Sequence, residues 1–534
     1  MSRDIGADAH AQRRRIRRTR RLIHAVTAVA VLLTAAVGAD AVAVSPSATP
    51  PPPPSTAEQE KGMRAGMPFQ DPATVDATGS ASPDLTLTLD AARSRFDVSG
   101  REVYGASYTG SFVAPTVRVA PGSTVTVHLV NHLPVATNLH FHGLHVSPEG
   151  QSDDPFLCVA PGGSTTYRLE IPADHAQGTF WYHSHAMGTS CPMADGMAGH
   201  NAGFTPGDVE NQIFAGLSGA LIVGDDRTLL PAGLRDVTAH TVVLKDAQLD
   251  AGGHILQGTA ADPLQSGNPT VRLVNGRLRP VLPMRPDETQ LWRLVNAGAD
   301  IFYRLRLDGR RFTVVGEDGT PVAAITTADE LLLPPGKRYD VLVTASGTPG
   351  RTVLRTAAYS NGPQGDAYPD VPLATVAVTG RPAHRLPEPT GALPTAPADL
   401  AIAPVARRRT LDLSESADGN TFYIDGQQFA MDRSVFDTPA RLGTVEEWTI
   451  VNHSGEDHPF HLHTTAFQVL SVDGAAQPYT HRQDTVPVPH AVDGVPGRVV
   501  IRVAFEDYPG RWMFHCHIAA HEDHGMMSYI DVVP

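Results

Sequence analysis

Four His-x-His pairs are the residues of this 534-residue chain whose type and spacing indicate chemistry, and the last pair encloses a cysteine. In a β-strand, alternate side chains point to the same face, so each pair can aim two imidazoles at one point. Eight imidazoles that share one centre are enough to bind three metal ions. The pairs are His140 and His142, His183 and His185, His461 and His463, and His515 and His517.

Cys516 lies between the two histidines of the last pair, so in a strand its side chain points to the opposite face. It can therefore bind a different metal on the other side of the same strand. His521 follows it by five residues and Met526 by ten, and His458 supplies a second imidazole three residues before His461. A His₂Cys set with a weak axial Met is the ligand set of blue electron-transfer copper. Zinc also binds Cys and His, but it does not explain eight further paired histidines.

The spacing around the pairs repeats along the chain. Asn131 precedes the histidines of the first pair by 9 and 11 residues, and Asn452 precedes those of the third pair by the same intervals. Gly178 precedes the second pair by 5 and 7 residues, and Gly510 precedes the last pair likewise. One structural unit therefore occurs near each end of the chain, and each copy carries two His-x-His pairs.

A third copy of the unit, without ligands, lies between these two. Residues 286–296 read like residues 121–131, and both stretches end on asparagine. Short alternating strands, 45 prolines and 48 glycines favour an all-β fold of sandwiches joined by turns. We therefore expect three like domains, with the metal cluster between the first and the third. Their predicted ranges are 83–226, 237–381 and 409–534, with a linker at 382–408.

The N-terminus is typical of an export signal. Residues 13–21 are rich in arginine, an apolar run follows at 22–39, and small-x-small cleavage sites end it. We therefore expect 1–43 to direct export to the periplasm, the cell surface or the medium. A twin-arginine signal at Arg20-Arg21 and an ordinary secretory signal both fit, and an uncleaved membrane anchor is the alternative. Residues 44–82 are predicted to be a Pro/Ser-rich, disordered spacer.

Charge excludes some partners. Residues 44–534 carry 34 basic and 53 acidic side chains. Such a surface repels nucleic acid and anionic membranes, so we expect no nucleic-acid partner and membrane contact only through an uncleaved N-terminal segment.

Two cysteines remain when Cys516 is assigned to metal. Cys158 and Cys191 can form a disulfide in an oxidising compartment, and the alternative is two buried free thiols. Cysteine arithmetic favours the disulfide.

With these motifs in place, the chain resembles three-domain multicopper oxidases of the laccase-like, bacterial type. The resemblance covers nearly all of the chain after the signal. It rests on four motifs: His140-Phe141-His142-Gly143, His183-Ser184-His185, His458-Pro459-Phe460-His461-Leu462-His463, and the run from His515 to Met526. It implies three cupredoxin-like Greek-key β-sandwich domains and four copper ions, namely one type 1, one type 2 and a type 3 pair.

The resemblance also implies which residues bind each copper ion. The type 1 ligands are His458, Cys516 and His521, with Met526 axial. The type 2 ligands are His140 and His461. The type 3 ligands are His142, His183, His185, His463, His515 and His517.

The family reaction implies roles for three further groups. Cys516 passes single electrons from an external reductant to its two histidine neighbours, and four electrons reduce O₂ to two waters. Asp153 and Glu522 resemble the family's proton-relay acids, and Asp154 competes with Asp153 for that role. The alternative is that Asp153 and Glu522 only orient the histidines and transfer no proton. A buried carboxylate beside a metal and bound water is, however, suited to a proton relay.

The leading functional hypothesis is an exported, laccase-like oxidase of phenols or aromatic amines. The runner-up is an oxidase of Cu(I) or another metal ion, which Glu456 and Asp457 keep open because they precede His458. A copper-binding protein without activity is the third hypothesis, and the complete ligand set speaks against it. O₂ and a small reducing substrate are the expected partners, and a monomer is the default.

Overall fold

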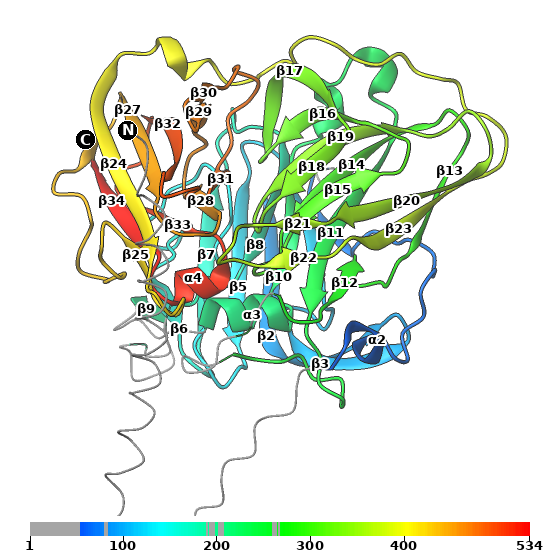
Figure 1. The fold of residues 1–534 in the computed structure, drawn as a ribbon, viewed down its shortest axis with the longest axis horizontal. Coiled ribbons are helices and arrows are strands. Elements are labelled where there is room, and N and C mark those ends of the chain that lie inside the picture. Colours follow the sequence, from blue (N-terminus) through cyan, green and yellow to red (C-terminus); the bar gives the residue numbers. More distant parts are fainter. Residues whose placement is uncertain are drawn as a thin grey trace, which may run out of the picture. The chain divides into compact units, whose positions relative to one another are not determined.

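The computed structural model describes residues 54–78, 84–187, 191, 198–200, 208–258, 264 and 267–534. The predicted export segment 1–43 lies outside these residues. In the part of the chain that the structure describes, no helix is long and apolar enough to cross a membrane. Strands dominate that part, and their sheets form three two-layered sandwiches (Figure 1). This confirms the all-β prediction.

The first sandwich consists of two four-stranded sheets, ordered β1-β4-β10-β8 and β3-β2-β5-β7. A small sheet pairs β6 with β9. The strands are β1 (Thr74–Asp76), β2 (Leu85–Val98), β3 (Arg101–Ser107), β4 (Ala114–Val119), β5 (Thr124–Asn131), β6 (Leu157–Val159), β7 (Ser164–Glu170), β8 (Gly178–His183), β9 (Ala198–His200) and β10 (Ser218–Val223).

The second sandwich has a six-stranded sheet, β12-β11-β14-β19-β16-β17, and a five-stranded sheet, β13-β23-β20-β15-β18. β21 and β22 form a separate two-stranded hairpin. The strands are β11 (Thr238–Ala247), β12 (Val271–Val274), β13 (Val281–Met284), β14 (Thr289–Asn296), β15 (Tyr303–Leu307), β16 (Phe312–Glu317), β17 (Thr320–Ala328), β18 (Glu330–Leu333), β19 (Arg338–Thr344), β20 (Gly350–Ala357), β21 (Tyr359–Ser360), β22 (Ala367–Tyr368) and β23 (Val371–Val378).

The third sandwich repeats this pattern, with sheets β25-β24-β27-β32-β29-β30 and β26-β34-β33-β28-β31. Its strands are β24 (Val405–Glu415), β25 (Phe422–Ile424), β26 (Ala440–Arg441), β27 (Thr444–Asn452), β28 (His458–Leu462), β29 (Gln468–Val472), β30 (Ala475–Ala476), β31 (Thr485–Val488), β32 (Gly497–Phe505), β33 (Gly510–Cys516) and β34 (Met527–Val533). The helices among the described residues are α2 (Thr56–Gln59), α3 (Asp208–Ala215) and α4 (Ala519–Asp523), with 3₁₀ turns η1 (Asp226–Leu229), η2 (Ala232–Leu234) and η3 (Leu400–Ile402).

The predicted repeat appears as the same strand in each sandwich. β5, β14 and β27 each pair in parallel with the first long strand of their own sandwich, namely β2, β11 and β24. Each of the three strands ends on a buried asparagine whose side-chain amide donates to two backbone carbonyls, one in the loop that follows and one on the last residue of a later strand. The asparagines are Asn131, Asn296 and Asn452. The strand on which the repeat was read therefore recurs in all three sandwiches.

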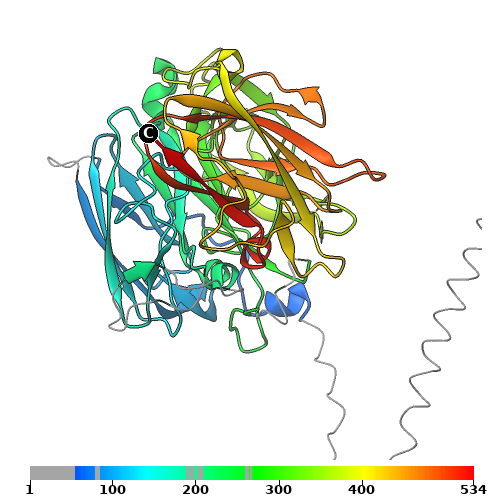
Figure 2. The same ribbon diagram turned by 90° about the vertical axis from the view of Figure 1, so that its left-hand side faces the viewer.

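The first and third sandwiches lie side by side. Figure 2 shows the red C-terminal strands beside the cyan strands of the first sandwich. An apolar cluster joins the two, because Phe156 and Met187 pack with Met513, Met527 and Tyr529. Below it, α3 and α4 are in contact, and the Asp523 carboxylate accepts hydrogen bonds from two amides in the first turn of α3. These contacts hold the first and third sandwiches together.

Cys158, on β6, and Cys191 form a disulfide with a Cα–Cα distance of 5.6 Å. The alternative of two free thiols is thereby excluded. Cys516 is the free cysteine, and it is buried.

The predicted disordered spacer 44–82 is wrong over residues 54–78. This stretch contains α2 and β1, and β1 adds to the first sandwich beside β4. The buried side-chain amide of Gln59 donates to the Pro269 carbonyl, and Glu60 forms an ion pair with Arg279. The proline-rich composition that suggested disorder ends near Thr56, so the order follows from tertiary contacts of the residues after it.

Candidate metal centre

Strand pairing sets the four His-x-His pairs next to one another in twos. In the first sandwich, His140 forms an isolated antiparallel bridge with His183 at the end of β8. In the third, His461 on β28 is the direct antiparallel partner of His515 on β33. The first and the third sandwich therefore each present two adjacent His-x-His pairs on one side, which is called the ligand edge below.

The two edges face each other, so all eight imidazoles converge. Nε2 of His515 lies 3.1 Å from Nε2 of His463 and 3.4 Å from Nε2 of His185. Nε2 of His517 lies 3.1 Å from Nδ1 of His142. All eight rings are buried, with exposed fractions of at most 2%. The structure therefore brings together every histidine that the sequence predicted for the cluster, between the first and third sandwiches.

The ring nitrogens are arranged to bind metal. Nδ1 of His140, His183 and His461 each contacts an oxygen atom, of Asp153, Ser184 and Asp484 respectively. With Nδ1 as the donor, Nε2 keeps its lone pair, and in each ring Nε2 is buried without a hydrogen-bond partner among the described residues. A buried, unpartnered lone pair is costly unless a ligand occupies it. The donor set therefore fits metal ions.

Seven of the eight imidazoles are also kept neutral, which metal binding requires. Burial, reinforced by the neighbouring imidazoles, holds the pKa well below its usual value in six of these rings, and burial lowers the pKa of His461 as well. The six are His142, His183, His185, His463, His515 and His517.

A second group lies on the opposite side of β33. Sγ of Cys516 is 3.6 Å from Nδ1 of His458 and 3.6 Å from Nδ1 of His521. Burial raises the pKa of the Cys516 thiol well above its usual value, so a bound cation is needed to hold the thiolate. Met526 is buried beside this group, where its amide donates to the His521 carbonyl and its carbonyl accepts from the Cys516 amide.

Two predicted carboxylates contact the cluster. Oδ1 of Asp153 lies 3.0 Å from Nδ1 of His140 and accepts the Phe141 amide at 2.9 Å. The Glu522 carboxyl group lies 3.2 Å from both His185 Nε2 and His515 Nδ1. Burial, with the charges of Asp523 and Asp300, raises the pKa of Glu522 well above its usual value.

Asp154, the competitor of Asp153 in the sequence, has a different place. It accepts the Phe156 amide and lines a separate cavity with Glu149 and Arg511.

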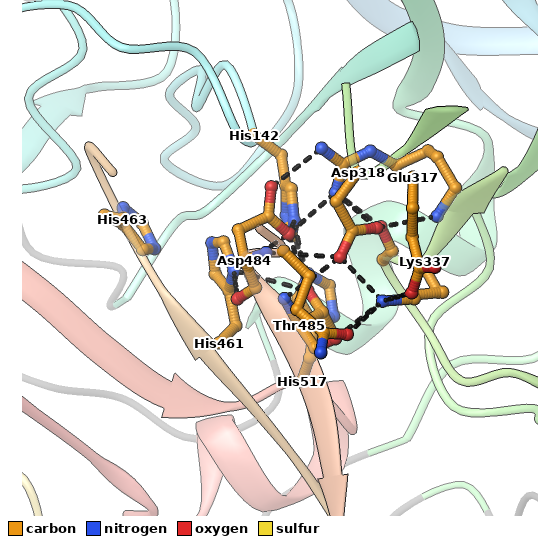
Figure 3. Close-up of polar contacts among 12 residues, drawn as sticks. His142, Glu317, Asp318, Lys337, His461, His463, Asp484, Thr485 and His517 are labelled. Atoms are coloured by element: carbon orange, nitrogen blue, oxygen red, sulfur yellow. Dashed lines mark hydrogen bonds and ion pairs between the residues drawn. The ribbon is translucent and has the colours of Figure 1, made fainter. Parts of the chain in front are cut away.

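Sequence reasoning missed a third acid, Asp484, which contacts both edges. Its Oδ1 lies 3.1 Å from Nε2 of His142 and 3.6 Å from Nδ1 of His461 (Figure 3). Burial alone would raise its pKa, but Arg338 and His142 outweigh that effect and hold the pKa well below its usual value. An acidic residue directly before the apolar strand β31 was the signal available, and it does not specify a partner.

An acidic cavity of about 120 Å³ opens beside His521. Asp300, Asp366, Glu415 and Glu456 line it, and Oε1 of Glu456 lies 3.2 Å from Nε2 of His521. Burial and the neighbouring Glu415 raise the pKa of Glu456 to about 9.

Asp457 does not line this cavity. Its carboxylate accepts the Tyr359 hydroxyl at 2.6 Å and lies 2.7 Å from Nδ1 of His490. The two adjacent acids that the sequence singled out therefore have different surroundings.

Comparison with known proteins identifies relatives of this arrangement. Models of the multicopper oxidase family match residues 91–202, 233–375 and 403–534. The three matches follow the order of the three sandwiches and together span most of the described chain.

Two curated relatives match over most of their length. Multicopper oxidase MmcO of Mycobacterium tuberculosis is 27% identical over 503 residues, which covers 86% of this chain and 90% of the relative. The laccase of Bacillus subtilis is 26% identical over 492 residues, which covers 80% of this chain and 89% of the relative. A solved multicopper oxidase of Campylobacter jejuni, titled a metallo-oxidase, aligns with a TM-score of 0.72 at 24% identity, over 88% of this chain and 96% of that one. The shared fold confirms the predicted cupredoxin-like class.

Proposed function

This chain belongs to the multicopper oxidase family, and we propose that it binds four copper ions at its two metal centres. Members of this family are copper oxidoreductases that couple oxidation of a reductant to reduction of O₂. The observation that carries the proposal is the set of buried, unpartnered imidazole nitrogens of the His-x-His pairs, together with the Cys516 group next to His515 at the end of β33.

We assign the ligands as the motifs predict. His458, Cys516 and His521 hold the type 1 ion, with Met526 axial, and His140 and His461 hold the type 2 ion. The type 3 pair is held by His142, His183, His185, His463, His515 and His517. Two of the close donor groups in the structure support this division: His458 with Cys516 and His521 for type 1, and His185 with His463 and His515 for type 3.

Bound copper supplies the one-electron redox steps and the reduction of O₂ to water. The protein supplies their separation in space. Cys516 faces the reductant side of β33, and its chain neighbours His515 and His517 face the O₂ side. Glu522 is placed to donate protons there, because it contacts His185 and His515.

Replacing Cys516 tests the electron route. Cys516→Ser is expected to lose the blue absorption and the oxidation of every reductant, because serine does not provide the thiolate. Copper analysis should fall from four to three ions per chain. The double variant Cys158→Ser/Cys191→Ser removes the other two cysteines and should keep the blue colour. A blue, fully active Cys516→Ser protein would contradict the assignment of Cys516 as a type 1 copper ligand.

The cavity beside His521 favours a cationic reductant. Four carboxyl groups line it, and its volume of about 120 Å³ is below the roughly 300–1,000 Å³ of pockets for drug-sized organic ligands. A low-valent metal ion, such as Cu(I) or Fe(II), matches both the oxygen donors and the size of this cavity. We therefore propose metal-ion oxidation as the activity that this site supports best.

Oxidation of phenols or aromatic amines is the second candidate. The ring of Phe422 lines the same cavity and stacks on His521 at 3.9 Å, which offers an aromatic surface beside the type 1 ligand. The relative from Bacillus subtilis is itself named a laccase.

Oxygen uptake with Cu(I) and with a methoxyphenol distinguishes the two. Glu415→Gln removes one cavity carboxyl group without touching a proposed ligand. If the substrate is a cation, its KM should rise about tenfold, equivalent to about 1.4 kcal/mol, with the phenol rate unchanged. Asp329→Asn, at an exposed acid outside the cavity, is the control. Cu(I) oxidation at the uncatalysed background beside fast phenol oxidation would assign the phenol instead.

We also propose that the protein is exported and acts as a monomer. The disulfide supports an oxidising compartment, and one chain contains every proposed ligand. Determining the N-terminal residue of protein recovered outside the cytoplasm tests cleavage near residue 43, and the mass in solution tests the oligomeric state.

A further inference from the structure

We infer that Arg338 of the second sandwich is a positioning residue for the metal cluster, because it holds Asp484 in place and Asp484 orients His142 and His461. The second sandwich carries no proposed copper ligand. This inference gives it a part in the chemistry, and it rests on the proposed copper function.

Asp484 links the ligand edges of the first and third sandwiches. Its Oδ1 accepts from Nε2 of His142 at 3.1 Å, and its backbone carbonyl accepts from Nδ1 of His461 at 2.8 Å. The Thr485 hydroxyl donates to the same Oδ1 at 2.9 Å. All four side chains are buried. One carboxylate and its own carbonyl therefore set the orientation of a ring from each edge.

Arg338 binds this carboxylate in a bidentate manner, through both Nη atoms of its guanidinium group. Nη1 lies 2.8 Å from Oδ1 of Asp484, and Nη2 lies 2.7 Å from Oδ2. Two parallel bonds fix the carboxylate plane as well as its position. Neither side chain is more than 1% exposed, so the pair is not weakened by solvent as a surface ion pair would be.

A further row of buried charges supports the pair from the second sandwich. Asp318 accepts the backbone amides of Arg338, Asp484 and Thr485 at 3.0–3.2 Å. Nζ of Lys337 lies 2.8 Å from Asp318 and donates to the Thr485 carbonyl at 3.0 Å. Figure 3 shows Asp484 between the histidines and this row. Hydrogen bonds to Asp318 and from Lys337 of the second sandwich thus hold the start of β31, next to the cluster, in place.

Two glycines leave room for the arrangement. Gly143, which directly follows the first His-x-His pair, has φ of +85°, and a Cβ there would collide with both Arg338 and Asp484. Gly336 has φ of +81°, and a Cβ there would lie 2.8 Å from His517 and 3.0 Å from Cε1 of His142. The second sandwich therefore approaches the imidazoles as closely as backbone allows.

The chemical consequence concerns which nitrogen His142 offers. A carboxylate only accepts hydrogen bonds, so Asp484 keeps the His142 proton on Nε2 and leaves Nδ1 free. Nδ1 is the atom that faces His517, at 3.1 Å. Without Arg338, the Asp484 carboxylate would be buried with its charge unpaired, and it would no longer hold this tautomer.

Copper content and spectroscopy of the full-length, copper-loaded protein test the inference. Arg338→Met and the nearly isosteric Asp484→Asn are expected to weaken copper binding at the cluster about 10- to 100-fold and to change the type 2 electron paramagnetic resonance spectrum. The blue absorption of the Cys516 site should stay. Arg338→Lys keeps the positive charge but cannot form the bidentate hydrogen bonds. It should therefore retain more of the type 2 signal than Arg338→Met does.

Arg293→Met is the matched control. Arg293 lies in the same sandwich, is as fully buried, and pairs with Asp226 instead of the cluster. It should lower stability and leave the type 2 spectrum unchanged. Wild-type copper affinity and spectrum in both Arg338→Met and Asp484→Asn would overturn the inference. Wild-type protein that binds no copper at the cluster would instead overturn the proposed function.

Discussion

Asp153 and Glu522 are both buried carboxylates beside imidazoles, and their contacts separate their roles. Asp153 accepts a backbone amide as well as the His140 ring, so its carboxylate is held in one orientation. Glu522 lies between two rings, and both of its oxygens lack hydrogen-bond partners among the described residues outside those ring contacts. Asp153 therefore suits an orienting role, and Glu522 suits proton donation.

Glu522→Gln is predicted to slow O₂ reduction by about 10²–10⁴-fold, the usual contribution of a general acid. Reduction of the blue copper by substrate without O₂ should keep its wild-type rate. Stopped-flow absorption measures the two steps separately. Asp153→Asn should instead alter the type 2 copper spectrum. A Glu522→Gln protein with normal turnover would exclude the relay.

A buried acid predicts how stability depends on pH. Burial raises the pKa of Asp208, at the start of α3, to about 7. Its folded-state pKa thus exceeds the unfolded value near 4, so its stabilising contribution is complete below about pH 4 and is lost as pH rises through about 7. Asp208→Asn should therefore flatten the decline of unfolding free energy between pH 4 and 7. Urea denaturation of the copper-free protein measures this, and parallel wild-type and variant curves would contradict it.

At the scale of elements, the strand that ends on asparagine is the unit that the three sandwiches share. In the third sandwich, Oδ1 of Asn452 accepts the Ser454 hydroxyl at 2.6 Å, and that hydroxyl lies 2.7 Å from Nε2 of His458. In the second, the matching oxygen of Asn296 accepts the Gly298 amide. The same strand end therefore supports a proposed copper ligand in one copy and only a loop in the other.

Asn452→Ala is predicted to affect both stability and the blue site. Two buried carbonyls lose their donor, at about 1–3 kcal/mol each, and the Ser454 hydroxyl that contacts His458 loses its anchor. Calorimetry should show a lower unfolding temperature, and absorption should show a shifted or weakened blue band. Asn296→Ala is the matched control, with a comparable loss of stability and an unchanged blue band. Identical spectra for the two variants would refute the orienting chain.

At the scale of the whole molecule, the proposed copper ions tie the first sandwich to the third. The first and the third sandwich supply four imidazoles each, and the contact between His142 and His517 joins residues that are 375 positions apart in sequence. The hydrogen bond from Arg338 to Asp484, 146 positions apart in sequence, connects the second sandwich to the same cluster. Metal binding is therefore coupled to the assembly of all three sandwiches.

Removing copper is accordingly predicted to lower the unfolding temperature. A ligand at 100 times its dissociation constant stabilises the folded state by about 2.7 kcal/mol per site. Differential scanning calorimetry of copper-loaded and copper-free protein measures the difference. Cys516→Ser, which lacks one site, should show a smaller difference than wild type. Equal unfolding temperatures with and without copper would contradict the coupling.

Some features follow from local sequence. The two-residue repeat of a strand places alternate side chains on one face, so His-x-His spacing and the intervening Cys516 predict two metal groups on opposite faces of β33. Local alternation and turns likewise predict the sandwiches, and the recurring Asn131, Asn296 and Asn452 predict their threefold repeat. These signals need only neighbours along the chain.

The fold class, the repeat and the residues able to bind copper can thus be predicted from local sequence. The packing of the sandwiches sets which strand ends face each other, brings Asp484 and Arg338 to the cluster, and makes the cavity at His521 acidic. Its carboxyl groups come from the second and third sandwiches. The physical reason is that such contacts depend on how separate sheets pack, and charged residues such as Arg338 look alike in sequence whether they face solvent or a buried partner.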